Sequence, residues 1–227
     1  MIRRKIKTVL KNPFIIFKVL TCKLMSIYYS RWIDEGKGKI VVTNPFLKLR
    51  ISKNSGAKLI VNGVVTISSH IGGRSPIVIC QGINSILKID GDFIIGNGVR
   101  VDLSDRANLY IGGKDLESGS GITADTIIMC NKKIHIGKDF LCAWGVFISD
   151  SDWHKIEGQD DQKDVFIGDH VWVANNSSIL KGSVIGNNSI IAGQSKIINK
   201  EYSPNSLLAG IPAKVVKIDI SWSRDII

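Results

Sequence analysis

Aliphatic residues recur every six positions along much of the chain. In the last third they fall at Ile167, Val173, Ile179, Ile185, Ile191 and Ile197. A small residue follows four of them, at Gly168, Ala174, Gly186 and Ala192. The same spacing occurs upstream at Ile71, Ile77, Ile83, Ile89, Ile95 and Val101, and in a shifted register at Ile136, Cys142 and Ile148. A period of six matches neither a helix, which repeats every 3.6 residues, nor a half-buried strand, which alternates every two.

Six residues suit a short parallel strand followed by a tight corner. One aliphatic side chain per unit points inward, and Gly, Asn or Asp takes the corner, where a positive φ is often needed. Three units close one triangular coil, and stacked coils bury each other's apolar ring. The spacing therefore predicts an all-β solenoid, because the strands of the alternative fold, a β-sandwich, recur at roughly 8–12 residues.

The solenoid is predicted to span residues 36–217, after a helical segment at 1–35 and before a tail at 218–227. Apolar residues of the first segment step by three or four positions, as on one helix face: Ile6, Leu10, Pro13, Phe17, Leu20, Leu24 and Ile27. Pro13 is expected to divide the segment into two short helices. Since Lys18 and Lys23 interrupt the apolar run, no transmembrane span of about 20 residues is predicted.

Composition places the packing on aliphatic residues, because 44% of the chain is hydrophobic but only 7% is aromatic. The four cysteines show no metal-binding spacing, which fits unpaired thiols in a reducing compartment: Cys22, Cys80, Cys130 and Cys142. The first residues lack an apolar stretch followed by a small-residue cleavage site, so no signal peptide is expected. Together these features predict a cytoplasmic protein.

Positive charge is concentrated in one segment. Residues 1–33 contain eight of the 30 basic residues and no acidic residue, while the whole chain has a formal net charge of +10. The remainder is nearly neutral, so binding to nucleic acid is not expected. Two functions of the basic segment stay open. It caps the solenoid against strand pairing, with Phe17, Leu20 and Leu24 packed on the coils, or it lies on the anionic inner face of a membrane.

The stretch ISDSDWHKI, residues 148–156, interrupts the period, which resumes at Ile167. It brings Asp150, Asp152 and Trp153 beside His154. Because imidazole titrates near neutral pH, a loop histidine beside acids is a candidate general base. The alternative is a surface histidine in a polar turn. The remaining histidines are not expected to compete (His70, His135 and His170), and the remaining acids of the loop are expected to be solvated (Glu157, Asp160, Asp161 and Asp164).

The segment from Ile167 to Lys217 resembles the hexapeptide-repeat acyltransferases. Its sequence, IGDHVWVANNSSILKGSVIGNNSIIAGQSKIINKEYSPNSLLAGIPAKVVK, is similar to the C-terminal signature of galactoside, maltose and bacterial polysaccharide O-acetyltransferases. The resemblance extends over roughly residues 40–217 and implies a left-handed parallel β-helix, although the general rule for parallel crossovers favours right-handed ones. It also implies a homotrimer, since the family builds its sites at subunit interfaces.

By this resemblance the interrupting loop carries the general base. His154 would take a proton from a sugar hydroxyl, which then attacks the thioester of acetyl-CoA. Asp152, in preference to Asp150 or a backbone carbonyl, is expected to fix the imidazole tautomer. Trp153 is a candidate stacking surface for a sugar ring. Trp172 is expected to line the wall near acceptor and thioester, with packing on the coil as its alternative.

The same resemblance assigns residues to acetyl-CoA: Ala174, Asn175, Ala192, Gly193, Asn199, Lys200, Lys214 and Lys217. Ala174 and Asn175 are expected near the thioester. Ala192 and Gly193 are expected one coil later, along the pantetheine arm. Asn199 and Lys200 are expected at the nucleotide end, and Lys214 and Lys217 are expected at phosphate. A solvated surface charge is the alternative for each lysine.

Three other functions stay open. An N-acetyltransferase acting on an amino sugar or nucleotide sugar needs a similar base. Zinc carbonic anhydrases share the architecture, but His135, His154 and His170 lack that family's closely spaced pair, so no metal is expected. The third is a non-catalytic solenoid that binds a partner protein. Acceptor specificity is expected in the loops near 113–133 and 149–166, where the period lapses.

Overall fold

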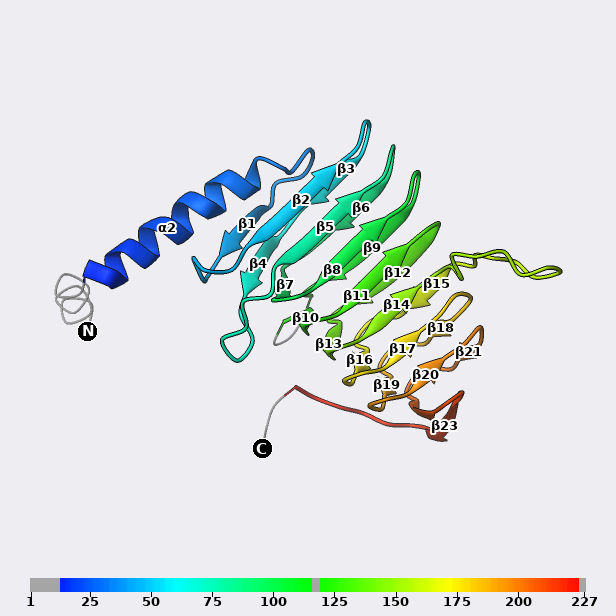
Figure 1. Cartoon of the computed structure of the whole chain (residues 1–227). Coiled ribbons are helices and arrows are strands. Elements are labelled where there is room, and N and C mark those ends of the chain that lie inside the picture. The colour runs from blue at the N-terminus through cyan, green and yellow to red at the C-terminus, as the bar shows by residue number, and fades with distance from the viewer. Residues whose placement is uncertain (1–12, 116–118, 225–227) are drawn as a thin grey trace.

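The computed structural model describes residues 13–115 and 119–224, which form a parallel β-helix preceded by one helix (Figure 1). Three parallel sheets make the sides of a triangular coil, and successive strands move from one sheet to the next. This arrangement confirms the predicted solenoid.

Sheet I contains β1 (Lys39–Val42), β4 (Val64–Ser68), β7 (Phe93–Gly96), β10 (Gly121–Ala124), β13 (Leu141–Trp144), β16 (Trp172–Val173), β19 (Ile190–Ile191), β22 (Leu207–Gly210) and β23 (Ala213–Lys217). Sheet II contains β2 (Leu49–Lys53), β5 (Ile77–Gln81), β8 (Arg100–Leu103), β11 (Ile127–Cys130), β14 (Phe147–Ser149), β17 (Ser178–Ile179) and β20 (Lys196–Ile197). Sheet III contains β3 (Lys58–Val61), β6 (Ile86–Ile89), β9 (Asn108–Gly113), β12 (Lys133–Lys138), β15 (Val165–Ile167), β18 (Val184–Ile185) and β21 (Glu201–Tyr202). Among the strands of residues 13–115 and 119–224, only the last pair, β22 and β23, is antiparallel, and it ends sheet I.

The core is a column of aliphatic side chains inside the coil. The six predicted aliphatics from Ile167 to Ile197 are all fully buried. Val173 lies beside Ile191 in sheet I and Ile179 beside Ile197 in sheet II, 18 positions further along the chain in each case. Three units of six therefore make one coil here, as predicted.

Two predicted inward positions of the first half are wrong. Ile71 is 91% exposed and Ile83 is 46% exposed, and both lie in turns between strands. The reason is coil length. Ile51 pairs with Ile79, 28 positions later, and Ile79 pairs with Val101 after 22 positions. Coils of that length cannot be built from three units of six residues. The six-residue spacing at Ile71 and Ile83 therefore does not predict which side chains point into the coil.

Helix α2 (Pro13–Ser30) runs along β1, the first strand of sheet I (Figure 1). The Ser26 Oγ accepts a hydrogen bond from the Val42 N–H at 2.9 Å, and the Ser30 Oγ accepts one from the Ile40 N–H at 3.0 Å. Backbone groups at a free strand edge need such partners. The helix therefore covers the edge of β1 with a face that contains serines.

The apolar face predicted to pack in a cap is not the buried one. Phe17, Leu20 and Leu24 are each more than half exposed, whereas Met25 and Tyr29 pack against the core. The need to satisfy the N–H groups of β1 turns the serine face inward and the Phe17 face outward. The predicted helical positions Ile6 and Leu10 and the basic residues before Pro13 lie outside the described residues.

After β23, residues 218–224 run back along the solenoid toward earlier coils (Figure 1). The Ile220 N–H donates to the Asn205 carbonyl at 3.0 Å, and an Arg224 Nη1 donates to the Gly119 carbonyl at 3.0 Å. The segment predicted as a tail is thus attached to the solenoid. Among the helices of the described residues, none is sufficiently long and apolar to cross a membrane.

Candidate active site

A loop of residues 150–164 projects at the corner between sheets II and III, where β14 ends and before β15 begins (Figure 1). Asp150 is the first residue of this loop, and its side chain is fully buried. The Asp150 carboxylate accepts backbone hydrogen bonds from Asn131 at 2.7 Å, Lys132 at 2.8 Å and Lys133 at 2.7 Å. Successive N–H groups of this kind form a concave site for an anion. Asp150 therefore fixes the loop to the preceding coil.

The Cys130 thiol donates to the Asp150 carboxylate at 3.7 Å. Burial and the nearby Asp150 charge raise the pKa of Cys130, and burial raises the pKa of Cys142 to about 12. Both side chains are buried. They are protonated packing residues near neutral pH, as thiols in apolar surroundings usually are.

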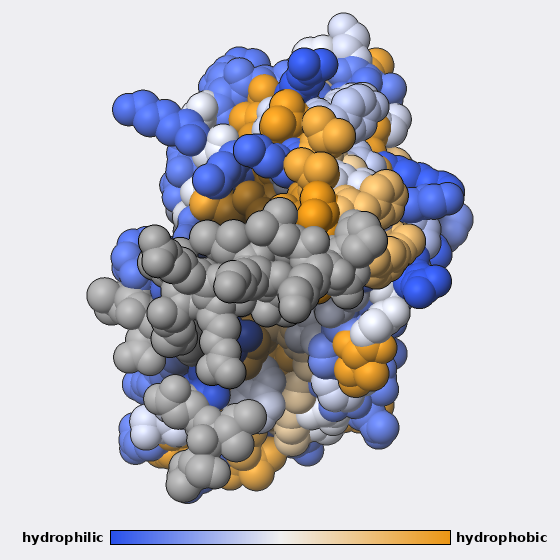
Figure 2. Space-filling view, turned by 90° about the vertical axis from the view of Figure 1, so that its left-hand side faces the viewer, coloured by the Kyte–Doolittle hydropathy of each residue, from blue (hydrophilic) through white to orange (hydrophobic). Residues whose placement is uncertain are grey.

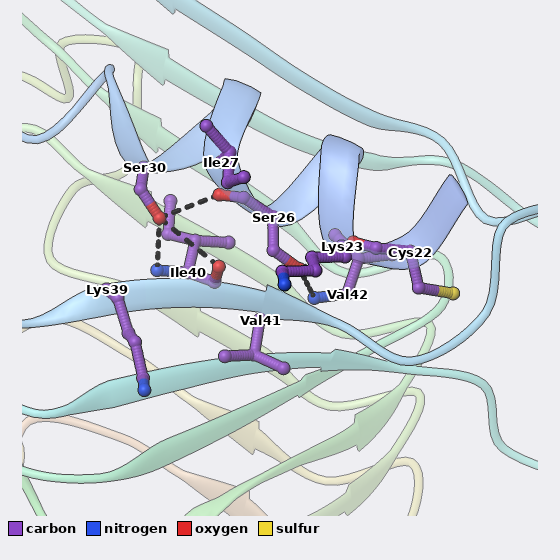
Figure 3. A pocket seen from close by; sticks show the side chains of 9 residues that line it. All are labelled: Cys22, Lys23, Ser26, Ile27, Ser30, Lys39, Ile40, Val41 and Val42. Carbon is purple, nitrogen blue, oxygen red and sulfur yellow. Dashed lines mark hydrogen bonds between the residues drawn. The ribbon is translucent and has the colours of Figure 1, made fainter. Parts of the chain in front are cut away.

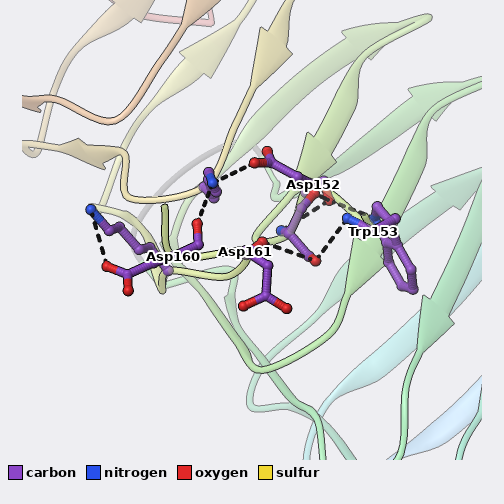
Figure 4. A network of polar contacts seen from close by, with 8 residues as sticks. Asp152, Trp153, Asp160 and Asp161 are labelled. Atoms are coloured by element: carbon purple, nitrogen blue, oxygen red, sulfur yellow. Dashed lines mark hydrogen bonds and ion pairs between the residues drawn. The ribbon is translucent and has the colours of Figure 1, made fainter. Parts of the chain in front are cut away.

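The rest of the loop is closed by a network of polar contacts (Figure 4). The Asp152 N–H donates to the Asp161 carbonyl at 2.8 Å, and the Asp152 carboxylate forms an ion pair with Lys181. The same ammonium donates to the Asp160 carbonyl. Lys181 comes from the next coil, so this one cation ties both ends of the loop tip to the solenoid.

Trp153 and His154 follow this anchored stretch. The Trp153 indole N–H donates to the Ser149 Oγ at 3.1 Å, and Trp153 adopts a positive φ of 62°. His154 is exposed. Within the described part of the chain its imidazole has no hydrogen-bond partner, and the predicted contact with Asp152 is not formed, because that carboxylate meets the ammonium of Lys181. The loop thus presents a free imidazole at a fixed place.

The four residues predicted along the pantetheine arm do come together, at the corner between sheets I and II. Ala174 and Asn175 follow β16, and Ala192 and Gly193 follow β19, one coil later. The Ala174 N–H donates to the Ile191 carbonyl at 2.9 Å, and the Asn175 carbonyl accepts from Gln194 at 2.9 Å. We call these four residues the donor corner.

Two rows of outward side chains run across sheet I beside the donor corner. Val173 points inward, so Trp172 and Ala174 on either side of it point outward. Trp172 pairs with Leu141 on one side and Ile190 on the other, which makes one row bulky. The other row is small, with Ala143, Ala174, Ala192 and Ala209 all half-buried. A row of small side chains therefore runs across sheet I beside the row of bulky ones.

Trp172 is 37% exposed and does not stand alone. The Trp222 ring lies 5.9 Å from it, and Trp222 also stacks on His170 at 4.0 Å with an interplanar angle of 11°. The Trp222 indole N–H donates to the His170 carbonyl at 3.1 Å, while the His170 Nε2 lies 3.1 Å from the Trp222 carbonyl oxygen. Trp222 was not among the residues predicted from the sequence. The available signal was a tryptophan outside the repeat, in a segment predicted as a tail.

A second pair of rings that was not predicted, Trp144 and His70, lies at the same corner between sheets I and II. The Trp144 ring is exposed and stacks on His70, 5.8 Å away with an interplanar angle of 18°. The Asn176 N–H donates to the Trp144 carbonyl at 3.0 Å, so Trp144 stands one coil before the donor corner. The loop that carries His70 joins β4 to β5, far from this coil in sequence, and no local pattern could reveal the contact.

The other predicted donor residues lie elsewhere. Asn199 and Lys200 are exposed at the corner between sheets II and III, and Lys214 and Lys217 are exposed on β23. In a single chain Asn199 and Lys200 are therefore separated from the donor corner, whereas Lys214 pairs with Ala209 on β22, the strand next to β19. His154 also lies at the corner between sheets II and III, on the other side of sheet II from the donor corner.

The three histidines considered for zinc occupy different surroundings. His135 stacks between Tyr110 and Phe166, and burial lowers its pKa, while His170 meets the tail and His154 lies on the loop. Across residues 13–115 and 119–224, no three His, Cys, Asp or Glu side chains gather to form a possible metal site.

Comparison with known proteins identifies relatives over most of the chain. Residues 164–199 match the family described as "Bacterial transferase hexapeptide (six repeats)". The chain is 32% identical over 198 residues to the "Uncharacterized 24.8 kDa protein in cps region" of Klebsiella pneumoniae, with 82% of each chain covered. It is 32% identical over 183 residues to the polysialic acid O-acetyltransferase of Neisseria meningitidis, covering 78% of this chain and 80% of that one. The crystal structure of the polysialic acid O-acetyltransferase OatWY matches with 28% identity and a TM-score of 0.56, covering 85% of this chain and 92% of that one.

Proposed function

The chain belongs to the hexapeptide-repeat acetyltransferase family, and from this premise we propose that it transfers the acetyl group of acetyl-CoA to a sugar hydroxyl of a bacterial surface polysaccharide. The observation that carries the proposal is the similarity to a polysialic acid O-acetyltransferase over most of both chains. The acceptor is a polymer rich in hydroxyls, and the reaction is acyl transfer from a thioester.

His154 is the proposed general base. A sugar hydroxyl is a weak nucleophile at neutral pH, so the reaction needs a group that removes its proton as it attacks the thioester carbon. The exposed imidazole of His154 stands free on a loop that Asp150 and Lys181 anchor to two coils. After attack, the hydroxyl proton resides on the imidazole, the sugar oxygen is acetylated and the CoA thiolate leaves. The same imidazole can then return its proton to the sulfur.

Asp152 has a positioning role in this proposal, through its ion pair with Lys181. Because its carboxylate is paired with that ammonium, Asp152 positions the loop, and the second nitrogen of the His154 ring is left for a backbone carbonyl or a neighbouring subunit. Trp153 and Trp172 are proposed to provide aromatic surfaces on which the acceptor sugar stacks. Both are more than one third exposed, which leaves ring area for stacking.

The donor corner is the proposed place of the pantetheine arm. Pantetheine is extended and contains amides, which pair with backbone N–H and C=O groups where side chains are small. The N–H groups of Ala174 and Ala192 are paired within sheet I, so the row of alanines would allow close approach of the arm, and the corner at the exposed Gly193 would supply backbone groups. The lysines at 200, 214 and 217, together with Asn199, are proposed for the nucleotide end of acetyl-CoA bound between subunits.

The separation of His154 from the donor corner supports a homotrimer. Sheet II lies between the two corners, so one chain cannot bring its own base to its own donor corner. A trimer in which the loop of one subunit faces the donor corner of the next would complete three identical sites. A cyclic arrangement of this kind is a closed assembly of heterologous contacts.

The proposal is tested by measuring CoA release from acetyl-CoA with sugars, nucleotide sugars and acidic and neutral polysaccharides as acceptors. We expect release with a hydroxyl-bearing polysaccharide and an O-acetyl ester in the product. Turnover of amino sugars alone, with an amide product, would replace O-acetylation by N-acetylation. No CoA release with any acceptor would remove the enzymatic proposal.

A further inference from the structure

The outer face of α2 exposes large apolar side chains on the side away from β1. Five large hydrophobic side chains are exposed there, Phe17, Leu20, Leu24, Ile27 and Tyr28, while Phe14 at the start of the helix stacks on Phe46 at 6.5 Å. Figure 2 views the molecule from the side of α2, and hydrophobic side chains reach the surface there. Contiguous exposed apolar area of this kind marks an interaction surface more often than a feature of the free monomer.

The opposite face of α2 already accounts for attachment to the solenoid. Ser26 and Ser30 hydrogen bond with β1, and Met25 and Tyr29 pack on the core. The outer face is therefore not needed to hold the helix in place. Its five exposed hydrophobic side chains require another explanation.

The charges on and beside this face are all positive. Lys18, Lys23 and Arg31 are exposed, and no acidic residue occurs before Asp34. An apolar helix face bordered by lysine and arginine suits the boundary between the headgroups and acyl chains of an anionic bilayer. A surface with this composition attracts anionic lipid through the lysines and takes hydrophobic side chains into the acyl region.

A pocket of about 590 Å³ opens between α2 and β1 (Figure 3). Ile27, Ile40, Val41 and Val42 give it an apolar lining, and Lys23 and Lys39 are exposed lysines among its residues. The combination of apolar walls and two ammonium groups fits a lipid whose headgroup carries phosphate.

We propose that the outer face of α2 and this pocket dock on an anionic lipid bilayer, with Lys23 and Lys39 at lipid phosphate. The helix lies on the membrane and does not cross it. This inference does not depend on the acetyltransferase reaction. It replaces the predicted cap function of Phe17, Leu20 and Leu24 by lipid contact.

A second copy of the chain fits this surface less well. In a two-fold contact the same patch meets itself, which would place Lys18, Lys23 and Arg31 of each copy against those of the other. The helix offers no acidic side chain to balance them. A bilayer that contains acidic lipid supplies the missing negative charge.

The test is sedimentation of the full chain with vesicles of phosphatidylcholine alone and of phosphatidylcholine with phosphatidylglycerol. Wild type should sediment with the acidic vesicles at low salt and be released at high salt, because salt screens the attraction. Leu20→Ser with Leu24→Ser should lower the partition coefficient at least tenfold, since each change removes buried apolar area. Lys18→Gln with Lys23→Gln should lower it by about fivefold per residue.

Matched controls lie at other places on the solenoid. Val216→Ser changes a similarly exposed aliphatic on β23, and Lys114→Gln changes an exposed lysine after β9. Both should sediment as wild type does. Absence of sedimentation at low salt, or an equal loss in the controls, would overturn the proposal. A change of oligomeric state in the Leu20 and Leu24 variant, measured by analytical ultracentrifugation, would assign the surface to a second copy. CoA release with a soluble acceptor should be the same in all these variants, so failure of membrane binding and failure of the proposed reaction are told apart.

Discussion

The coils after β15 and the coils before β10 are built differently. Strands β16 to β20 contain two residues each and bury one aliphatic side chain, and neighbouring coils are 18 positions apart. Strands β4 to β8 contain four or five residues and bury at least two side chains. Their coils take 22 to 28 positions, as Ile79 shows in its pairs with Val101 and Ile51.

The difference teaches where each region can carry function. Coils of constant length bring equivalent corner residues into register, which is why Ala174 and Ala192 lie side by side directly after adjacent strands. Coils of variable length place their extra residues in loops, such as the one that carries His70 to Trp144. Under the proposed function, the regular region suits the acetyl-CoA donor, and the loops of the irregular region suit the acceptor.

The largest expected effect falls on the loop that separates the two regions. Replacing His154 by Ala should lower kcat by roughly 10²–10⁴ while acetyl-CoA binding and unfolding temperature stay unchanged, because the imidazole is exposed and makes no hydrogen bond within the described residues. Steady-state kinetics and calorimetry measure both quantities. Wild-type turnover in a folded variant would mean that the loop has no catalytic role.

The next prediction compares how much one predicted inward residue from each region contributes to the free energy of unfolding. Ile191→Ala should reduce the free energy of unfolding by about 2–5 kcal/mol, because the side chain is fully buried between coils. Ile71→Ala, at a predicted inward position that is exposed, should change it by less than about 0.5 kcal/mol. Urea unfolding at one protein concentration compares them. Similar losses in both variants would break the distinction drawn between the regions.

An intermediate effect tests the anchor of the loop. Asp150→Asn leaves one acceptor oxygen where the carboxylate serves three backbone N–H groups, so we expect a loss of about 1–3 kcal/mol in unfolding free energy. Asp161→Asn is the matched control, because its contacts in the network use the backbone carbonyl. If both substitutions are neutral, the N–H groups at 131–133 do not hold the loop.

The smallest effect sharpens the assignment of the donor corner. A Cβ added at Gly193 would lie 3.1 Å from the flexible Asn175 Oδ1, so Gly193→Ala should be tolerated. Gly193→Val should raise the KM for acetyl-CoA roughly tenfold, or about 1.4 kcal/mol, without loss of stability. Unchanged acetyl-CoA binding by calorimetry in the valine variant would place the arm on another coil.

Much of the fold follows from the sequence where local spacing decides it. The period of six from Ile167 to Ile197 sets both the coil length and the register of the donor corner. The face of α2 that turns inward could not be predicted, because it depends on N–H groups of β1 that need the hydroxyls of Ser26 and Ser30.

Contacts between distant segments were also beyond prediction. The pairing of Asp152 with Lys181 joins residues from successive coils, and a spacing pattern does not say which cation will reach a carboxylate. The stack of Trp222 on His170 belongs to the same class. Sequence patterns identify the loop and its histidine, but they do not identify what positions them.

The return of residues 218–224 also has a consequence for the order of assembly during synthesis. Trp222 reaches back 52 positions to His170, and Arg224 reaches back 105 positions to Gly119. Each coil can pack on the one before it as soon as it leaves the ribosome, since the contacts of a solenoid are between neighbours. The indole of Trp222 emerges after every coil described here has been made. The contacts of Trp222 with Trp172 and His170 therefore form after the coils, and a nascent chain can hold folded coils before this part of the candidate site exists.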